Sequence, residues 1–298
     1  MSVPILIACF IRPEQLKRCL EPLESLPNPI YVVIDSPRDE IDSIQIIKVK
    51  EILKAARIEV VDTLSFNSNQ GTNSVALGID WVLQKYNSVI VIEEDILISR
   101  QFVSFAEGML LEYEDDFRVG SITAMNLVPT NKISHEIDLY RFSAYFYAWG
   151  WATWRTRWEQ MIPTSQWDID ALTTPPTARN PLTRQKWKNR LWEVKSGRAP
   201  GLWDYRWIYT YWSKEWLTII PNRNLALNIG FDLSATHTRV APEWAPKVVQ
   251  VIDDLAMETL EVTQDIKADK WSSKHIHNSY WVTILKTLIK KKIRSWIT

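Results

Sequence analysis

Three consecutive carboxylates, Glu93, Glu94 and Asp95, directly follow an apolar run at 89–92 that has the composition of a buried strand. Like charges repel there and each loses water, so the arrangement is costly by itself. A divalent cation offsets the repulsion, and oxygen-only ligands suit Mg²⁺ or Mn²⁺, which keep positions for water and substrate phosphates. The triplet therefore predicts a metal site for a phosphorylated substrate; the alternative is the start of a solvated loop.

Two further charged residues follow predicted strands. Strands are expected at 3–10, 31–35, 58–61, 89–92 and 119–124, and helices at 14–26, 44–54, 75–83 and 101–110. This alternation predicts an α/β fold with a mainly parallel sheet and helices on both faces. Arg12 and Asp35 follow the first and second strands, so they should join the triplet at the carboxyl edge, where such sheets bind ligands.

Composition narrows the class of protein. The 298 residues carry 35 basic and 35 acidic side chains, which argues against a nucleic-acid partner. There is no GxGxxG or Walker loop among only eight glycines, so a phosphate site would need a cation. Cys9 and Cys19 are expected to be buried thiols in a reducing compartment. No secretory signal or membrane-spanning run is recognised, which favours a cytoplasmic location.

Tryptophan is distributed unevenly. Of 16 tryptophans, only Trp81 precedes Trp149, so the two halves should differ in role. Most of these rings should be core, and a few could stack on sugar rings. Near the C-terminus, residues 281–296 combine an apolar helical stripe with lysines and arginines and no acidic residue. That pattern is typical of a helix on an anionic membrane surface, or of one packed on the domain with a solvated basic edge.

Four stretches in the same order carry a family resemblance. They are PILIACFIRPEQLKRCLEPL at 4–23, VIVIEEDILISRQFVSF at 89–105, SITAMN at 121–126 and the Trp203-Asp204 pair. Over about residues 3 to 238 the chain resembles glycosyltransferases of the GT-A fold, in particular the N-acetylglucosaminyltransferase I type and its bacterial relatives. The resemblance implies a Rossmann-like sheet and a metal-dependent, inverting transfer of a sugar from a nucleotide-sugar, most often a UDP-sugar.

The resemblance also implies roles for the residues at the strand ends. Asp95 would be the metal ligand for Mn²⁺ or Mg²⁺. Glu94 would lie near the ribose and sugar, and Glu93 would accept hydrogen bonds from the donor sugar. Arg12 would contact the diphosphate, and Asp35 would read the uracil ring. For Arg12 and Asp35 the alternatives are a salt bridge with a neighbouring carboxylate and a loop cap before a proline, respectively.

The second half would supply the base and the acceptor site. Asp204, in the segment 201–207, matches the family position of the general base; the alternative is an aspartate that pairs with Arg206 or caps a helix. Gly150 would let backbone approach the donor closely, and His237 would donate to the diphosphate or complete the metal shell. His275 and His277 are expected at the surface. The aromatic side chains selected as acceptor contacts are Trp149, Trp151, Trp203 and Trp207.

These expectations divide the chain into a donor half at 1–130, an acceptor half of the same domain at 131–240 and a C-terminal helical extension at 241–298. The partners would be a nucleotide-sugar and a saccharide or lipid-linked glycan, with peripheral membrane contact through the extension. Two other functions stay open: a sugar-phosphate nucleotidyltransferase, which normally needs an N-terminal Gly-rich loop, and a non-catalytic carbohydrate-binding protein.

Overall fold

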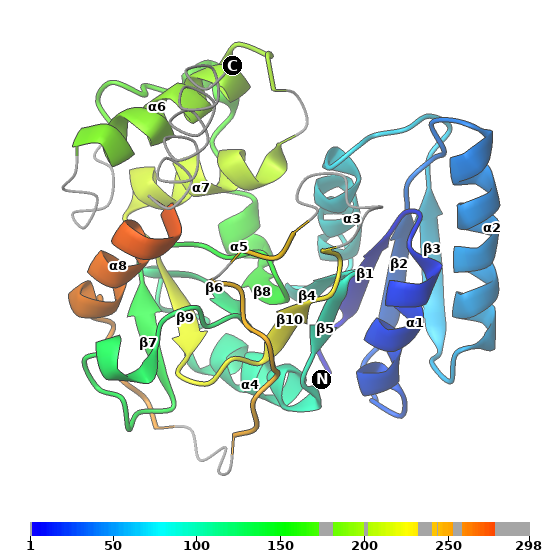
Figure 1. The fold of residues 1–298 in the computed structure, drawn as a ribbon, viewed down its shortest axis with the longest axis horizontal. Helices are drawn as coiled ribbons and strands as arrows, with labels where there is room; N and C mark the ends of the chain where they lie inside the picture. Colours follow the sequence, from blue (N-terminus) through cyan, green and yellow to red (C-terminus); the bar gives the residue numbers. More distant parts are fainter. Residues whose placement is uncertain are drawn as a thin grey trace, which may run out of the picture.

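A computed structural model describes residues 2–172, 181–199, 202–231, 240–242, 244–252 and 258–277. Its centre is an eight-stranded sheet (Figure 1). In spatial order the strands are β3 (Val60–Ser65), β2 (Ile30–Ile34), β1 (Ile5–Cys9), β4 (Ser88–Glu93), β8 (Trp151–Trp154), β6 (Val119–Thr123), β9 (Leu217–Pro221) and β7 (Tyr140–Ser143). The first four are mutually parallel, whereas β8 and β7 run antiparallel to their neighbours.

Helices cover both faces of this sheet (Figure 1). They are α1 (Pro13–Leu20), α2 (Glu40–Ala55), α3 (Asn73–Leu83), α4 (Arg100–Glu112), α5 (Arg155–Trp158), α6 (Pro181–Lys195), α7 (Trp203–Lys214) and α8 (Ile266–Ser272). One core cluster joins the sheet to α1, α2 and α4, and a second joins it to α3, α5, α6 and α7. The predicted α/β fold, a Rossmann-like sheet of the GT-A kind, is therefore confirmed.

Strand β1 shows how the sequence produces these two layers. Ile5, Ile7 and Cys9 belong to the first cluster, and Leu6 and Ala8 to the second. Successive side chains of a strand point to opposite faces, so a strand buried on both sides must be apolar throughout. Cys9 and Cys19 are both buried free thiols, as predicted.

Short, well-defined helix starts fix the chain that follows each strand. Only three residues, 10–12, separate β1 from α1, and Pro13 occupies the first turn, where its missing N–H costs nothing. Asp39 caps α2 by accepting a hydrogen bond from the Asp42 N–H at 2.9 Å, and Ser99 caps α4. Arg12 is thus held at the carboxyl edge of the sheet by its position between a strand and a helix.

The tryptophans of the second half of the chain lie mainly in the second core cluster. The rings of Trp151 and Trp203 stack with centroids 5.5 Å apart, and Trp207 lies 5.1 Å from Trp158. The buried tryptophans are Trp151, Trp154, Trp158, Trp167, Trp203, Trp207, Trp212 and Trp216. These are eight of the 14 tryptophans in the described residues, so the prediction that most of the rings are core is confirmed for that part of the chain.

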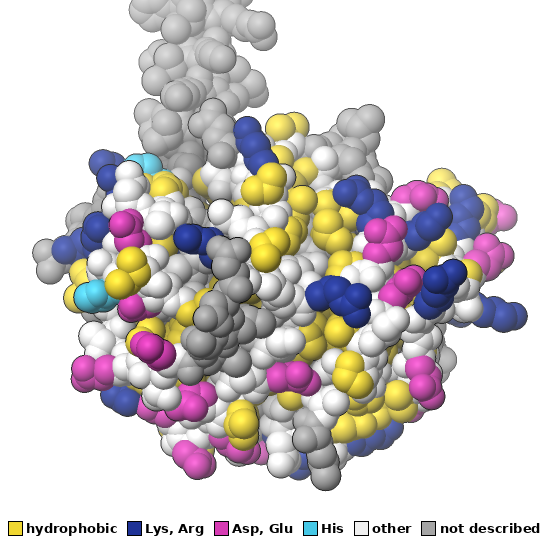
Figure 2. Space-filling model, turned by 90° about the horizontal axis from the view of Figure 1, so that it is seen from below, with side chains coloured by type: hydrophobic (Ala, Val, Ile, Leu, Met, Phe, Trp, Pro, Cys, Tyr) yellow, Lys and Arg dark blue, Asp and Glu magenta, His cyan; other side chains and the backbone are white. Residues whose placement is uncertain are grey.

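Around this core the surface is mixed in charge. On the face drawn in Figure 2, acidic and basic side chains both occur among hydrophobic and polar ones. Within the described ranges, no helix has the length and apolar character needed to cross a membrane. The predicted basic helix at 281–296 lies outside the described residues.

Candidate active site

An ion pair between Arg12 and Asp95 marks the carboxyl edge of the sheet. Strands β1 and β4 are aligned so that Ala8 lies opposite Glu93, which brings the residues after both strands together. Arg12 donates from Nη1 to Asp95 Oδ2, and the two side chains are only 10% and 17% exposed. Arg12 was predicted to contact a diphosphate, with a salt bridge as the alternative. The salt bridge is the contact observed.

Backbone from the second half of the chain covers this ion pair. Strand β10 (Ala226–Asn228) pairs with β5 (Ile96–Ile98), directly after the acidic triplet. The Ile229 N–H then donates to the Asp95 carbonyl oxygen at 2.9 Å. A Cβ on Gly230 would lie 2.1 Å from Asp95 Oδ2 and 2.2 Å from Arg12 Nη1. Only glycine fits against the pair in this arrangement.

Glu94 points away from the open edge of the sheet. Its Oε2 accepts from the Phe10 N–H at 2.7 Å and its Oε1 from the Ile11 N–H at 3.2 Å. The residue is 7% exposed, and burial raises the pKa of its carboxyl to about 7. Both oxygens hold the loop that carries Arg12, and contact of Glu94 with a ribose and sugar stays a prediction.

Glu93 and Asp204 come close enough to influence each other. Burial, and after it the negative charges of Asp95 and Asp204, raise the pKa of Glu93 to about 8. Asp204 lies in the first turn of α7, at the helix end that favours negative charge. The structure thus brings the predicted base to the predicted donor site, although more than 100 residues separate them in the sequence.

Asp35 connects the end of β2 to the loop before α3. Its Oδ1 accepts from the backbone N–H groups of Ser36 and Gln70, both at 2.8 Å, and its Oδ2 accepts from Asn69 Nδ2 at 3.0 Å. The side chain is buried. Asp35 therefore fixes the Asn69–Gln70 backbone at the sheet edge, and its reading of a uracil ring stays a prediction.

The carboxylates supply oxygen ligands for a cation but not a complete cage. Among the described residues no group of three His, Cys, Asp or Glu side chains could hold a metal. Glu94 is committed to backbone, and Asp95 is paired with Arg12. Mg²⁺ needs only one or two carboxylates when water and substrate phosphates complete its shell. Asp95 fits that kind of site as its one carboxylate. His237 lies outside the described residues.

Gly150 has a structural reason to be glycine. Its φ is +68°, a region that other residues rarely adopt. A Cβ there would lie 3.0 Å from Ile98 Cγ2 and 3.2 Å from Ala124 Cβ. The atoms that would meet a side chain at Gly150 thus belong to Ile98 and Ala124, and the close approach of its backbone to a donor stays a prediction.

The four predicted acceptor tryptophans have different environments. Trp151 and Trp207 are 1% and 0% exposed, and Trp203 is 4% exposed. Since both faces of the Trp151 and Trp207 rings are covered, the prediction of acceptor stacking is wrong for these two. Trp203 touches open space only along a cavity wall. Trp149 is half-buried and lies 5.7 Å from Phe231, the residue after Gly230. It is the best placed of the four.

The two C-terminal histidines also differ. His275 is exposed, as expected, and stacks on Trp271. His277 is not a surface side chain: its ring stacks on Tyr145 at 4.4 Å and lies 5.4 Å from Trp187. Burial and the nearby Lys186 lower the pKa of His277 to about 3. It is therefore a neutral packing residue.

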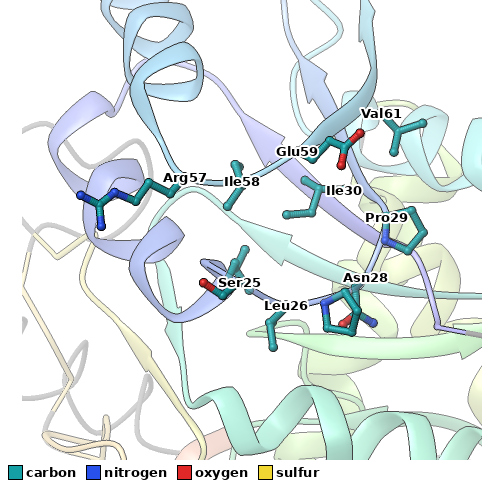
Figure 3. A pocket seen from close by; sticks show the side chains of 11 residues that line it. Ser25, Leu26, Asn28, Pro29, Ile30, Arg57, Ile58, Glu59 and Val61 are labelled. Carbon is teal, nitrogen blue, oxygen red and sulfur yellow. The ribbon is translucent and has the colours of Figure 1, made fainter.

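One cavity is remote from these residues. It lies between the residues after α1, the start of β2 and the segment 57–61 that leads into β3 (Figure 3). Ile30 is the first residue of β2, whereas Asp35 directly follows the strand's other end. The cavity is thus at the amino edge of the sheet, opposite the carboxylates.

Three features of the site were not anticipated from the sequence. They are the hydrogen bonds that Glu94 accepts from the β1–α1 loop, the Asn69–Gln70 contacts with Asp35, and the fit of Gly230 against the ion pair. The run Asn69-Gln70-Gly71, polar and directly before a helical pattern, was the one local signal of a site loop. The other two depend on pairings across more than 80 residues.

No protein-family model and no curated protein matches the chain. Among solved structures it is similar to residues 1–349 of TarS from S. aureus, at 9% identity and a TM-score of 0.42, covering 76% of this chain and 59% of that one. It is also similar to the glycosyltransferase GlyE of Streptococcus pneumoniae TIGR4, at 12% identity and a TM-score of 0.34, covering 73% of this chain and 45% of that one. The chain thus spans less than two thirds of either protein.

Proposed function

We propose that the protein is a metal-dependent inverting glycosyltransferase that uses a nucleotide-sugar, in the first instance a UDP-sugar. The observation that carries this proposal is the convergence of Asp204 with Glu93 and the Arg12–Asp95 pair at one sheet edge. A sugar transfer needs a base for the acceptor and positive charge for the leaving diphosphate. Asp204, the candidate base, and Arg12, the candidate cation, lie on opposite sides of Glu93 in the sequence. Both are close enough to Glu93 in the folded chain for their charges to influence its pKa.

Asp204 serves as the general base in this proposal. It accepts the proton of an acceptor hydroxyl while that oxygen bonds to the anomeric carbon and the bond to the diphosphate oxygen breaks. Glu93 keeps its proton near neutral pH, because burial and neighbouring charges raise its pKa to about 8. A protonated Glu93 can both donate to and accept from a sugar hydroxyl. The two carboxyls would then have separate tasks.

Arg12 and Asp95 serve the diphosphate side. Arg12 binds phosphate oxygens through its guanidinium, and Asp95 holds Mn²⁺ or Mg²⁺ in competition with Arg12. When bound, the metal neutralises charge that develops on the leaving diphosphate. Glu94 positions the loop that carries Arg12.

Calorimetric titration of UDP with and without Mn²⁺ tests the proposal. We expect Mn²⁺ to strengthen UDP binding to the natural protein and to have no effect on binding to Asp95→Ala. Asp204→Asn should bind UDP normally and lose transfer by about 10²–10⁴-fold. Asp170→Asn is the matched control, because Asp170 is a largely exposed aspartate on the same half of the chain. UDP binding that ignores Mn²⁺, or near-normal transfer by Asp204→Asn, would refute the proposal.

A further inference from the structure

A second cavity lies beside the proposed base. It has a volume of about 380 Å³ and is bounded by the start of α3, the end of α6 and the first turns of α7. That volume is within the range of sites that hold small ligands. Gln70 lines it on one side, and the backbone of Gln70 holds Asp35. Trp203 lines the other side, directly before Asp204 in α7. The cavity therefore adjoins both the donor edge and the base.

Arg206 is the charged residue of this cavity. Its Nε is buried and has no hydrogen-bond partner in the described part of the chain. None of the salt bridges found among the described residues includes Arg206. A buried N–H without a partner costs about 1–3 kcal/mol, more when the group is charged. A water molecule or a ligand oxygen completes such a group, and the cavity beside Arg206 has room for either.

The other lining residues define the kind of ligand. Gln70, Asn73 and Thr164 add polar groups, Leu202 and Trp203 form an apolar wall, and none of the described residues that line the cavity is a carboxylate. An aromatic and aliphatic wall suits the apolar face of a sugar ring. A guanidinium with no counter-ion suits a carboxylate or a phosphate, both of which accept its paired N–H donors. Together they fit a sugar that carries a negative charge.

We propose that this cavity binds an anionic sugar of the acceptor glycan and that Arg206 recognises its carboxylate or phosphate. The assignment of this sugar to the acceptor rests on the proposed function, whereas the binding of an anionic sugar in the cavity does not. The negative group would be anchored beside α7, so that the sugar reaches toward Asp204. Arg206 is then a specificity residue, and neutral glycans would be poor acceptors.

The test is a titration of the purified protein with glucuronate, glucose 6-phosphate and glucose at constant ionic strength. We expect one or both anionic sugars to bind. Glucose should bind at least about ten-fold more weakly, because it has no negative group to pair with Arg206. Preference for glucuronate assigns a carboxylate, and preference for glucose 6-phosphate assigns a phosphate. Equal binding of all three, or binding of none, would overturn the inference.

Three variants localise the effect. Arg206→Gln should weaken binding of the anionic sugar by roughly ten-fold or more. Arg206→Lys retains the charge without the Nε–H and should weaken it several-fold, which keeps the test valid if the glutamine variant does not fold. Lys214→Gln removes an exposed positive charge from the same helix and should leave binding unchanged. Unaltered affinity in folded Arg206→Gln, or an equal loss in Lys214→Gln, would contradict the assignment.

UDP binding separates this inference from the proposed function. Arg206 lies outside the Arg12–Asp95 site, so Arg206→Gln should bind UDP with Mn²⁺ like the natural protein. If UDP does not bind but the anionic sugar does so through Arg206, the glycosyltransferase proposal fails and the subsite stands. If UDP binds and the anionic sugars do not, the reverse holds.

Discussion

Arg12 and Asp95 form an ion pair across the carboxyl ends of the neighbouring strands β1 and β4, and the backbone at Gly230 lies directly against it. Each partner has a second proposed task, since Arg12 is the cation nearest a diphosphate and Asp95 the oxygen ligand nearest a metal. In the ion pair, each residue neutralises the charge of the other. These are the charges that the proposed donor phosphate and metal would bind. Donor binding must exchange this contact for contacts to phosphate and metal.

Replacing Arg12 should weaken donor binding. Arg12→Met removes the guanidinium and leaves Asp95 without this partner, so we expect UDP affinity to fall by roughly ten-fold or more. Calorimetry in the presence of Mn²⁺ measures the change. Arg18→Met is the matched control. Arg18 is exposed on α1, so this substitution removes the same charge at a position away from the site. Similar losses in both variants would mean that the effect is one of net charge alone.

A methyl group at Gly230 should disturb the ion pair. Gly230→Ala would place a Cβ 2.1 Å from Asp95 Oδ2, so the loop or the pair must shift, at a cost of about 1–3 kcal/mol. We expect lower stability in urea unfolding together with weaker UDP binding. Gly197→Ala is the comparison, since a Cβ there meets nothing within 4 Å and costs only the strain of a positive φ. UDP binding by Gly230→Ala equal to that of Gly197→Ala would argue against the contact.

Two tryptophans of the same half should respond differently to truncation. Trp207→Ala opens a cavity in the second core cluster and should cost about 3–5 kcal/mol of unfolding free energy. Trp149 is only half-buried, so Trp149→Ala should cost less stability and weaken glycan binding several-fold through lost stacking. Urea unfolding and glycan titration of both variants measure the two effects. Glycan binding that survives Trp149→Ala intact would remove Trp149 from the acceptor site.

His277 should make the protein sensitive to mild acid. Its pKa is lowered from 6.5 to about 3 in the folded chain, so between these values the unfolded chain binds more protons. Stability attributable to His277 is therefore present above pH 6.5 and falls as the pH decreases, by up to about 1.4 kcal/mol per pH unit. His277→Phe keeps the stacking on Tyr145 and should flatten this dependence in urea unfolding at pH 7, 6 and 5.

The control for that measurement is His275→Phe. His275 is exposed, two residues away, and stacks on Trp271 in a similar geometry. Its replacement should leave the pH dependence of the natural protein in place. If both histidine variants flatten the curve equally, the acid sensitivity belongs to the segment and not to the buried ring.

Local patterns predicted the elements well. Strand β4 was expected at 89–92 and observed at Ser88–Glu93, and the helix expected at 44–54 is α2, Glu40–Ala55. The helix expected at 14–26 stops earlier as α1, at Leu20, and continues as a 3₁₀ turn at Glu21–Leu23 that contains Pro22. Continuous apolar runs sufficed for central strands such as β1, β2 and β6, in which every residue is buried, whereas the edge strand β3 is largely exposed.

Side-chain direction was harder to predict. Glu94 differs from Glu93 only by its place on the strand end, and alternation turned it toward the Phe10 and Ile11 N–H groups. Trp151 lies in β8 and Trp149 before it, so the first is core and the second half-buried. A residue type that suits a chemistry is visible in a sequence. Which neighbouring group already forms a hydrogen bond or ion pair with that residue depends on contacts between segments that are distant in the sequence.

Strand β8 has a mechanical consequence. It comes from the tryptophan-rich half but is hydrogen-bonded to β4 on one side and β6 on the other. Strands of both halves are therefore parts of one continuous hydrogen-bonded sheet, and the strand before Asp95 cannot separate from β8 without breaking its hydrogen bonds. The proposed donor edge is thus built on a sheet whose width is set when the chain folds, whereas Asp204 lies on α7, outside the sheet.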